Sequence, residues 1–480
     1  MEYEPVIGLE IHIQLKTLTK IFCSCKNTFE DEPNKNICPV CLGLPGVLPV
    51  LNKEALRLAM KVALALNCKI NSFIKFDRKN YFYPDLPKNY QISQYSLPLA
   101  EKGYLDIITQ GEEKRIFIRR LHMEEDAGKL VHLENYSLVD FNRAGCPLIE
   151  IVTEPVITSA QQAYDFLQQL KILVQYVEAS DCDMEKGTLR CDANVSLRRK
   201  GEEVLGTRTE IKNMNSFRAL KMALDYEIKR QESILREGGR IVQETRLWDE
   251  KKQRTFSMRS KEEVHDYRYF PEPDLVPFTI EKEVIDEIKA EIPSLPLQRL
   301  QNLRSRFSSL SFEEAFFLVQ EKSLVDYFEE CVSSYKNWRS ILNWIKGGVM
   351  EYMNSNNVRF FKDLKLQPSV FIDIVRKMDE GALNNQQTKK LLFKVLETGK
   401  SPQQVIKEEG LEQISDEDTV RRIIDEVLHS NPKAVQDYKQ GKTQVIGFLV
   451  GQVMKITGGK VNPKKVKECI ERRLVNEEIF

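Results

Sequence analysis

Four cysteines near the N-terminus constrain the fold of this chain more than any other feature. They stand as Cys23-Ser-Cys25 and, after a loop of twelve residues, Cys38-Pro-Val-Cys41. Two thiolates from one tight turn and two from another suit tetrahedral Zn²⁺, which binds sulfur at about 2.3 Å. The spacing predicts a closed structural zinc site with no open position for catalysis. Two alternatives remain, namely reduced thiols packed in a core and a disulfide framework.

The other cysteines and the N-terminus indicate the compartment. The chain opens with the acidic run Met1-Glu-Tyr-Glu4 and has no basic-then-apolar segment there, so no signal peptide is predicted. Scattered cysteines of this kind favour a reducing compartment, and we expect the cytoplasm. They are Cys68, Cys146, Cys182, Cys191, Cys331 and Cys469. The longest apolar run, Val445–Met454, is too short to span a bilayer.

Length and charge set further limits. The 480 residues predict about three domains. The formal net charge is zero, from 71 basic and 71 acidic residues. Any affinity for nucleic acid must therefore come from a local basic patch and not from the overall field of the protein.

The pattern along the chain predicts an α+β fold. Residues 1–280 alternate short apolar-polar strands with Gly, Pro, Asn and Asp turns, interrupted by helical periodicity at about 52–66 and 159–178. This predicts a cradle-like body with a large, mainly antiparallel sheet and the zinc knuckle. A proline-rich stretch at 270–277 suits a linker. We expect three domains, a body at 1–295, an all-helical middle at 296–405 and a small all-helical tail at 406–480.

Several predicted strands carry an unusual polar face. Side chains alternate between the faces of a strand, so the apolar residues of 6–15 form a core face while Glu10 and His12 lie on the other. The same period puts Asp192 opposite a core face in 192–198, and Glu210 opposite one in 208–212. Glu124 and Glu150 lie near the ends of two more strands.

Carboxylates and one imidazole on separate strands suit Mg²⁺ or Mn²⁺ bound to phosphate oxygens. The alternative is a sheet with one solvated face, which is common in antiparallel sheets. Lys79 and Arg143 are candidates for contact with phosphate or with a substrate carboxylate. The chain has no Walker A, dinucleotide-binding or G-x-S-x-G motif, so any ATP would bind to an unusual sheet.

The C-terminal segment is locally basic. Between Asn431 and Arg473 there are ten basic and three acidic residues. Such a patch in a neutral protein favours contact with an RNA backbone, and the alternative is a solvated helical face. The candidate contacts are Lys442, Lys460, Lys464, Lys465 and Lys467.

Five long blocks carry a resemblance to a known family. They are Val6-Ile-Gly-Leu-Glu-Ile-His12, Asp140–Ile151, Arg190–Ser196, Thr209–Phe217 and Tyr267–Asp274. The chain resembles the B subunit of the aspartyl/glutamyl-tRNA amidotransferases, the GatCAB complex. The resemblance spans nearly the whole chain, including a tail similar to the YqeY-type tRNA-binding domain.

The resemblance implies a ligase-type amidotransferase. A partner amidase, the A subunit, would release ammonia from glutamine, and a small C subunit would complete the heterotrimer. This chain would use ATP and Mg²⁺ to phosphorylate the side-chain carboxylate of Glu on tRNA(Gln), or of Asp on tRNA(Asn). Ammonia would then displace the phosphate.

The resemblance also assigns residue roles. It implies metal binding and catalysis by Glu10, His12, Glu124, Glu150, Asp192 and Glu210. It implies substrate or phosphate contact by Lys79, Arg143, Ser196 and Asn213. A second class of function stays open, a non-catalytic zinc-containing RNA-binding scaffold whose polar sheet face holds RNA instead of ATP.

Overall fold

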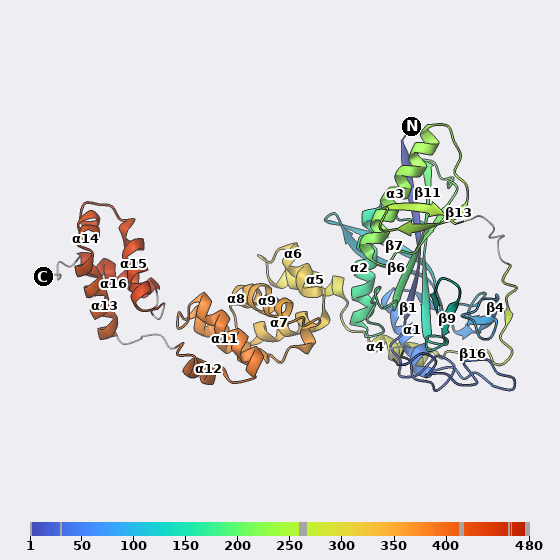
Figure 1. The fold of residues 1–480 in the computed structure, drawn as a ribbon, viewed down its shortest axis with the longest axis horizontal. Coiled ribbons are helices and arrows are strands. Elements are labelled where there is room, and N and C mark those ends of the chain that lie inside the picture. The colour runs from blue at the N-terminus through green and yellow to red at the C-terminus, as the bar shows by residue number, and fades with distance from the viewer. Residues whose placement is uncertain are drawn as a thin grey trace. The chain divides into compact units, whose positions relative to one another are not determined.

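The chain forms two compact units, and all the described strands belong to the first. The computed structural model describes residues 2–28, 31–258, 266–411, 417–458, 461 and 463–475. Contacts divide the chain into Met1–Val319 and Gln320–Phe480. The first unit combines a large sheet with helices, and the second is helical (Figure 1). The predicted α+β class, with a mainly antiparallel sheet followed by an all-helical region, is confirmed.

A nine-stranded sheet forms the centre of the first unit. Neighbouring strands pair antiparallel except for β12 and β13, which pair parallel. From one edge to the other the strands are β14 (Arg254–Ser257), β13 (Glu244–Asp249), β12 (Thr209–Lys212), β11 (Leu189–Arg199), β1 (Tyr3–Gln14), β10 (Pro147–Thr153), β7 (Glu112–Glu125), β6 (Ala100–Thr109) and β2 (Lys69–Ile70).

The apolar face of β1 is the centre of the core. Ile7, Leu9, Ile11 and Ile13 are each at most 1% exposed, as the period-two pattern predicts. Burying each of these side chains contributes about 1.5–3 kcal/mol. Three helices pack on this face of the sheet (Figure 1). They are α1 (Lys53–Ala65), α2 (Ala160–Tyr176) and α3 (Phe217–Arg236).

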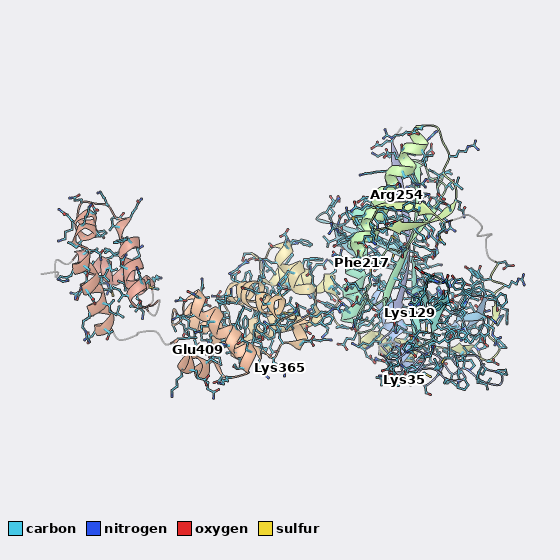
Figure 2. All side chains as sticks on the ribbon, in the orientation of Figure 1. Lys35, Lys129, Phe217, Arg254, Lys365 and Glu409 are labelled. Carbon is cyan, nitrogen blue, oxygen red and sulfur yellow. The ribbon has the colours of Figure 1, made fainter. Side chains whose placement is uncertain are left out.

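Each of these helices begins at a polar cap. The side chains of Asn52, Ser159 and Ser216 accept hydrogen bonds from backbone N–H groups in the first turns of α1, α2 and α3. Such caps satisfy donors that the helix leaves unpaired. The expectation of only two helices before residue 280 is wrong, because it omits α3. That helix starts at Phe217 (Figure 2), and its buried face combines Leu220 and Leu224 with alanines and with the polar Glu227 and Gln231.

Small sheets flank the main one. β15 (Phe270–Pro271), β4 (Asp77–Asn80) and β5 (Tyr90–Ser93) form one of them. β16 (Phe278–Thr279) pairs with β3 (Phe73–Ile74), and β8 (Lys129–His132) pairs with β9 (Ser137–Asp140). The prediction of a linker at 270–277 is therefore wrong. A proline can occupy an edge strand, and Pro271 pairs with Asp77 at such an edge.

Three more helices complete the first unit. They are α4 (Lys282–Ala290), α5 (Pro296–Arg306) and α6 (Phe312–Val319). The hydroxyl of Tyr176, in α2, donates to the carbonyl oxygen of Val319 at 2.8 Å, which ties the end of α6 to the body. The division of the chain at residues 295 and 405 stays a prediction.

The second unit consists of short helices. They are α7 (Lys322–Ser334), α8 (Trp338–Trp344), the π-helical turn η1 (Ile345–Val349), α9 (Met350–Ser355), the 3₁₀ turn η2 (Phe361–Asp363), α10 (Pro368–Asp379), α11 (Asn385–Thr398), α12 (Pro402–Glu408), α13 (Glu417–Ser430), α14 (Pro432–Lys439), α15 (Val445–Ile456) and α16 (Pro463–Val475). Leu449 and Val453 of α15 are buried in an apolar cluster with α13 and α16. Among the described helices, none has both the length and the apolar character to cross a membrane.

Candidate active site

A row of charged side chains crosses four neighbouring strands on the polar face of the main sheet. Arg190 on β11 pairs with His12 on β1, His12 pairs with Glu150 on β10, and Glu150 pairs with His122 on β7. Directly opposite residues of paired strands point to the same face. The row therefore results from the register of the sheet, with Glu124 following two residues after His122 on the same face.

His12, Glu124 and Glu150 converge to a single point. His12 Nε2 lies 3.4 Å from Glu124 Oε1 and 3.2 Å from Glu150 Oε2. One ligand atom from each residue falls within 4.8 Å of the others. Two ligands of one Mg²⁺ lie at most about 4.2 Å apart, since each bond is about 2.1 Å. Small side-chain adjustments thus suffice for a divalent cation to fit this group.

The electrostatics of this group also favour positive charge. Burial raises the pKa of Glu150, but the neighbouring His122 and His12 outweigh burial, and the net pKa lies below its ordinary value. The pKa of Glu124 is lowered in the same way, against its burial, by His122 and His12. Burial lowers the pKa of His12, yet Glu150 and Glu124 bring it above the ordinary value. Both carboxylates are therefore ionised and available to a cation.

Glu10, Asp192 and Glu210 form a second group around a lysine. Lys212 Nζ lies 2.9 Å from Asp192 Oδ2 and 3.1 Å from Glu210 Oε1. Burial raises the pKa of Glu10, and the charges of Glu150, Glu210 and Asp192 add to the effect. The six predicted metal ligands thus share one face, where Asp192 and Glu210 pair with Lys212 and Glu10 lies near both Glu150 and this pair.

The small sheet of β15, β4 and β5 contributes aromatic and basic side chains near this site. Lys79 Nζ, on β4, lies 4.8 Å from the ring centroid of Tyr267 and 5.9 Å from that of Tyr81. Its charge is one of the influences that lower the pKa of Glu150. From β5 of the same sheet, the Ser93 hydroxyl donates to Glu124 Oε2 at 3.4 Å. Lys79 therefore lies close to His12, Glu124 and Glu150, which together form the His12 group.

The other predicted contact residues have varied surroundings. Arg143 donates to the backbone oxygens of Ala127 and Gly128, and it lies 3.4 Å from Asp126. Asn213 donates to the carbonyl oxygen of Trp248 at 3.1 Å. These partners are structural contacts of the neighbouring loops and strands.

Ser196 lines a cavity of about 360 Å³ beside Glu10 and Asn194. The loop around Gly206 closes one side of this cavity. A Cβ on Gly206 would lie 2.0 Å from the carbonyl oxygen of Leu197, so only glycine permits this close approach. Arg119 and Arg208 add positive charge to the lining, and Val152 and Leu205 add apolar surface.

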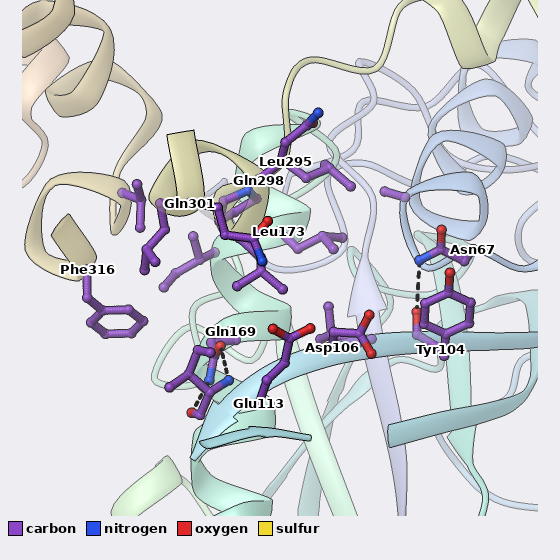
Figure 3. Close-up of a pocket in the computed structure, with 18 residues that line it drawn as sticks. Asn67, Tyr104, Asp106, Glu113, Gln169, Leu173, Leu295, Gln298, Gln301 and Phe316 are labelled. Atoms are coloured by element: carbon purple, nitrogen blue, oxygen red, sulfur yellow. Dashed lines mark hydrogen bonds between the residues drawn. The ribbon is translucent and has the colours of Figure 1, made fainter. Parts of the chain in front are cut away.

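A cavity of similar size, about 370 Å³, lies elsewhere in the first unit (Figure 3). Leu173 of α2, Leu295 and Phe316 supply much of its apolar lining, and Asp106 and Glu113 of β6 and β7 lie at its edge. None of the predicted site residues lines this cavity. Of the predicted site residues, Glu10 and Ser196 line the other cavity.

The four N-terminal cysteines converge as their spacing predicts. The four sulfur atoms, of Cys23, Cys25, Cys38 and Cys41, all lie within 4.8 Å of one another, so the group could hold a metal such as zinc. A hydrogen bond from Cys23, together with the nearby charge of Lys20, lowers the pKa of Cys41 to about 5. Lys20 is fully buried, and its Nζ lies 3.9 Å from the Cys41 sulfur. A buried cation beside thiolates fits a negatively charged zinc–thiolate centre.

Three of the predicted RNA-contact lysines lie on the last helix, α16, and Lys442 lies between α14 and α15. Lys464, Lys465 and Lys467 are exposed on α16, and Lys467 lies 3.9 Å from Glu471. Lys442 Nζ lies 2.9 Å from Asp437 Oδ1. Lys460 lies outside the described residues.

Sequence reasoning missed a histidine and two tyrosines near the His12 group. His122 lies beside Glu150, and its position two residues before Glu124 was a signal that it shares the same face. Tyr81 and Tyr269 also lie near the carboxylates, since burial raises their pKa values and the charge of Glu124 contributes. The pairing of β15 with β4 and the stacking of Tyr269 on Tyr95 bring Tyr269 there, and no sequence pattern indicates that pairing.

Comparison with known proteins identifies the class. Residues 5–286 match the family model described as the GatB/GatE catalytic domain, and residues 326–474 match the model described as the GatB domain. The first match covers nearly all of the unit that carries the polar sheet face.

Curated relatives are similar over their whole length. The B subunits of the aspartyl/glutamyl-tRNA(Asn/Gln) amidotransferases of Carboxydothermus hydrogenoformans and Persephonella marina are each 52% identical, and that of Moorella thermoacetica is 50% identical. The alignments cover 98–99% of this chain and 99–100% of each relative. The chain belongs to the family of aspartyl/glutamyl-tRNA(Asn/Gln) amidotransferase B subunits, which confirms the resemblance.

The cysteine cluster generates the first prediction. We expect about one Zn²⁺ per chain by elemental analysis, and loss of that zinc in a Cys38→Ser/Cys41→Ser variant. The midpoint of thermal unfolding should fall by about 5–10 °C, because structural zinc contributes folding energy directly.

The control is Cys469→Ser, which removes a half-buried thiol outside the cluster. It should retain both the zinc and the thermal midpoint. Native protein that was never exposed to chelator and yet contains no zinc would contradict the site.

Proposed function

We propose that this chain uses ATP to activate the side-chain carboxylate of Glu on misacylated tRNA(Gln), of Asp on tRNA(Asn), or of both. The observation that carries the proposal is the convergence of His12, Glu124 and Glu150 on one face, with Lys79 close by. Membership of the amidotransferase B-subunit family supports it. A carboxylate does not react with ammonia until it is part of a mixed anhydride, so the reaction requires such an activation step.

The reaction balances in two steps. The carboxylate oxygen attacks the γ-phosphorus of ATP, the bond to the β-γ bridging oxygen breaks, and ADP leaves. Ammonia then attacks the carbonyl carbon of the acyl phosphate, and inorganic phosphate leaves with loss of a proton to give the amide. Ammonia comes from a partner amidase, the A subunit, in a heterotrimer with a small C subunit.

His12, Glu124 and Glu150 would hold Mg²⁺, which supplies positive charge to phosphate oxygens when bound. Lys79 provides a fixed positive charge beside the same group, suited to the substrate carboxylate or to a phosphate. Asp192 and Glu210 hold Lys212 in place by ion pairs, so that its ammonium also faces this region. These residues thus present positive charge to two anionic reactants.

The cavity beside Glu10 is suited to the nucleotide. Its volume of about 360 Å³ lies in the range of small-molecule sites. Apolar side chains such as Val152 and Leu205 suit a base, and Arg119 and Arg208 suit phosphates. Ser196, at 5% exposure, adds a hydroxyl to this lining.

The division of labour within the heterotrimer can be tested with free ammonia. We expect this chain to form amide from ammonia, ATP and misacylated tRNA without any glutaminase of its own, because ammonia release belongs to the partner amidase. The measurement is amide formed on each misacylated tRNA, alone and with the two partner proteins added. An RNA-binding scaffold would show no ATP hydrolysis that depends on misacylated tRNA, and that outcome would refute the proposal.

The carboxylates of the His12 group provide a second test. Glu124→Gln and Glu150→Gln should each lower ATP-dependent phosphorylation by at least about 10²-fold, the scale seen when one electrostatic stabiliser of a transition state is removed. The matched control is Glu112→Gln on the same strand as Glu124, where the side chain is exposed. Near-normal amidation in the two variants, with circular dichroism and melting unchanged, would show that this face is only solvated.

The tail provides a third test. Replacing Lys464, Lys465 and Lys467 by Gln should weaken tRNA binding. The slope of log K against log salt concentration should also fall in magnitude by about 2–3, because up to three phosphate contacts disappear. The control replaces three exposed lysines of the first unit, Lys53, Lys129 and Lys251. Unchanged affinity and salt dependence in the tail variant would mean that its lysines are only solvated.

A further inference from the structure

His122 is a buried histidine behind the three residues that could hold a cation. It is 6% exposed, on β7, directly opposite Glu150 on β10. Its Nε2 lies 3.4 Å from Glu150 Oε2 and 3.8 Å from Glu124 Oε2. Its Nδ1 is buried and has no hydrogen-bond partner among the described residues.

His122 differs from His12 in its relation to the cluster. The atoms that lie within 4.8 Å of one another come from His12, Glu124 and Glu150, and His122 is not in that set. The His12 side chain is 23% exposed and that of His122 is 8% exposed. His12 is thus open to a ligand, and His122 contacts the carboxylates from the side of the protein.

The surroundings of the two ring nitrogens fix where the proton of the neutral ring lies. A proton on Nδ1 would leave a buried donor without an acceptor, which costs about 1–3 kcal/mol. It would also turn the lone pair of Nε2 toward two carboxylate oxygens. A proton on Nε2 removes both penalties, because Nε2 is the ring nitrogen that lies near the oxygens of Glu150 and Glu124.

We propose that His122 is a positioning residue, which donates from Nε2 and holds Glu150 and Glu124 in the orientation that binds a divalent cation. The inference rests on the proposed function of the His12 group as a cation site. Glu150 Oε2 lies between two imidazoles, at 3.2 Å from His12 and 3.4 Å from His122. A nitrogen that binds an ion cannot also donate, so with His12 as a ligand the remaining imidazole donor to Glu150 is His122. Hydrogen-bonded partners of metal ligands affect affinity in this way.

Mn²⁺ binding to the full-length chain tests the role without relying on activity. Titration followed by electron paramagnetic resonance or calorimetry should show Kd raised about 10–100-fold in His122→Met and His122→Asn. His122→Gln should lie nearer to the native value, because its amide nitrogen reaches the place of Nε2 while that of Asn reaches the place of Nδ1. His132→Asn, an exposed histidine on β8, is the control and should bind as the native chain does.

The outcomes separate this inference from the function on which it rests. A native chain that binds no Mn²⁺ would refute the cation site, and the role of His122 with it. Native binding with unchanged Kd in His122→Met and His122→Asn would refute only the role of His122. Equal losses in the Gln, Asn and Met variants would indicate a packing role and would also overturn the proposal.

A second measurement needs no variant. The chain has five histidines, so ¹⁵N-histidine labelling gives few signals. Long-range ¹H–¹⁵N correlation should show a proton on Nε2 of His122. An Nε2 that carries no proton would overturn the assignment even if every variant failed to fold.

Discussion

Strand β1 hydrogen-bonds to β10 on one side and to β11 on the other, and this pairing determines both faces of the sheet. On one face it buries Ile7, Leu9, Ile11 and Ile13, and on the other it aligns His12 with Glu150 and Glu10 with Asp192. Because side chains alternate with period two, a slip of one residue would expose the isoleucines and bury the charges. Burial of the apolar face thus fixes the geometry of the polar face. Strand pairing alone therefore brings His12 next to Glu150 and Glu10 next to Asp192.

The polar face remains stable because most of its negative charges have positive neighbours. Lys212 lies between Asp192 and Glu210, Arg190 donates to Asp126 at 2.7 Å, and Lys88 pairs with the buried Glu125. Among the described residues, Glu124 and Glu150 form ion pairs only with imidazoles, which are weaker and adjustable partners, and the charge of Lys79 acts on Glu150 without an ion pair. Carboxylates without a direct lysine or arginine partner are costly to bury, and they favour a mobile positive ion. The carboxylates that pair with lysine or arginine thus have a structural role, whereas Glu124 and Glu150 are suited to a ligand.

The sequence predicted the features that depend on local periodicity. Alternation along β1 and β11 predicted both faces, and cysteine spacing predicted the convergence of four sulfurs. Features that depend on pairing between distant segments were not predictable, such as β15 against β4, which brings Tyr269 to the carboxylates. The separation of Asp192 and Glu210 from the other predicted ligands was also not predictable, because it results from their ion pairs with Lys212. Helix α3 was missed for another reason, because its buried face includes the polar Glu227 and Gln231 beside two leucines and two alanines.

The same pairing has a consequence for synthesis of the chain on the ribosome. Glu10 and Asn194, which meet across β1 and β11, are 184 residues apart. At a translation rate of about 5–20 residues per second, roughly ten to forty seconds separate the emergence of the two strands. Until then the edge of β1 that pairs with β11 has no neighbour, and such an edge is a template for pairing with other chains. The nascent N-terminus of this protein is therefore a natural client for chaperones that shield unpaired strands.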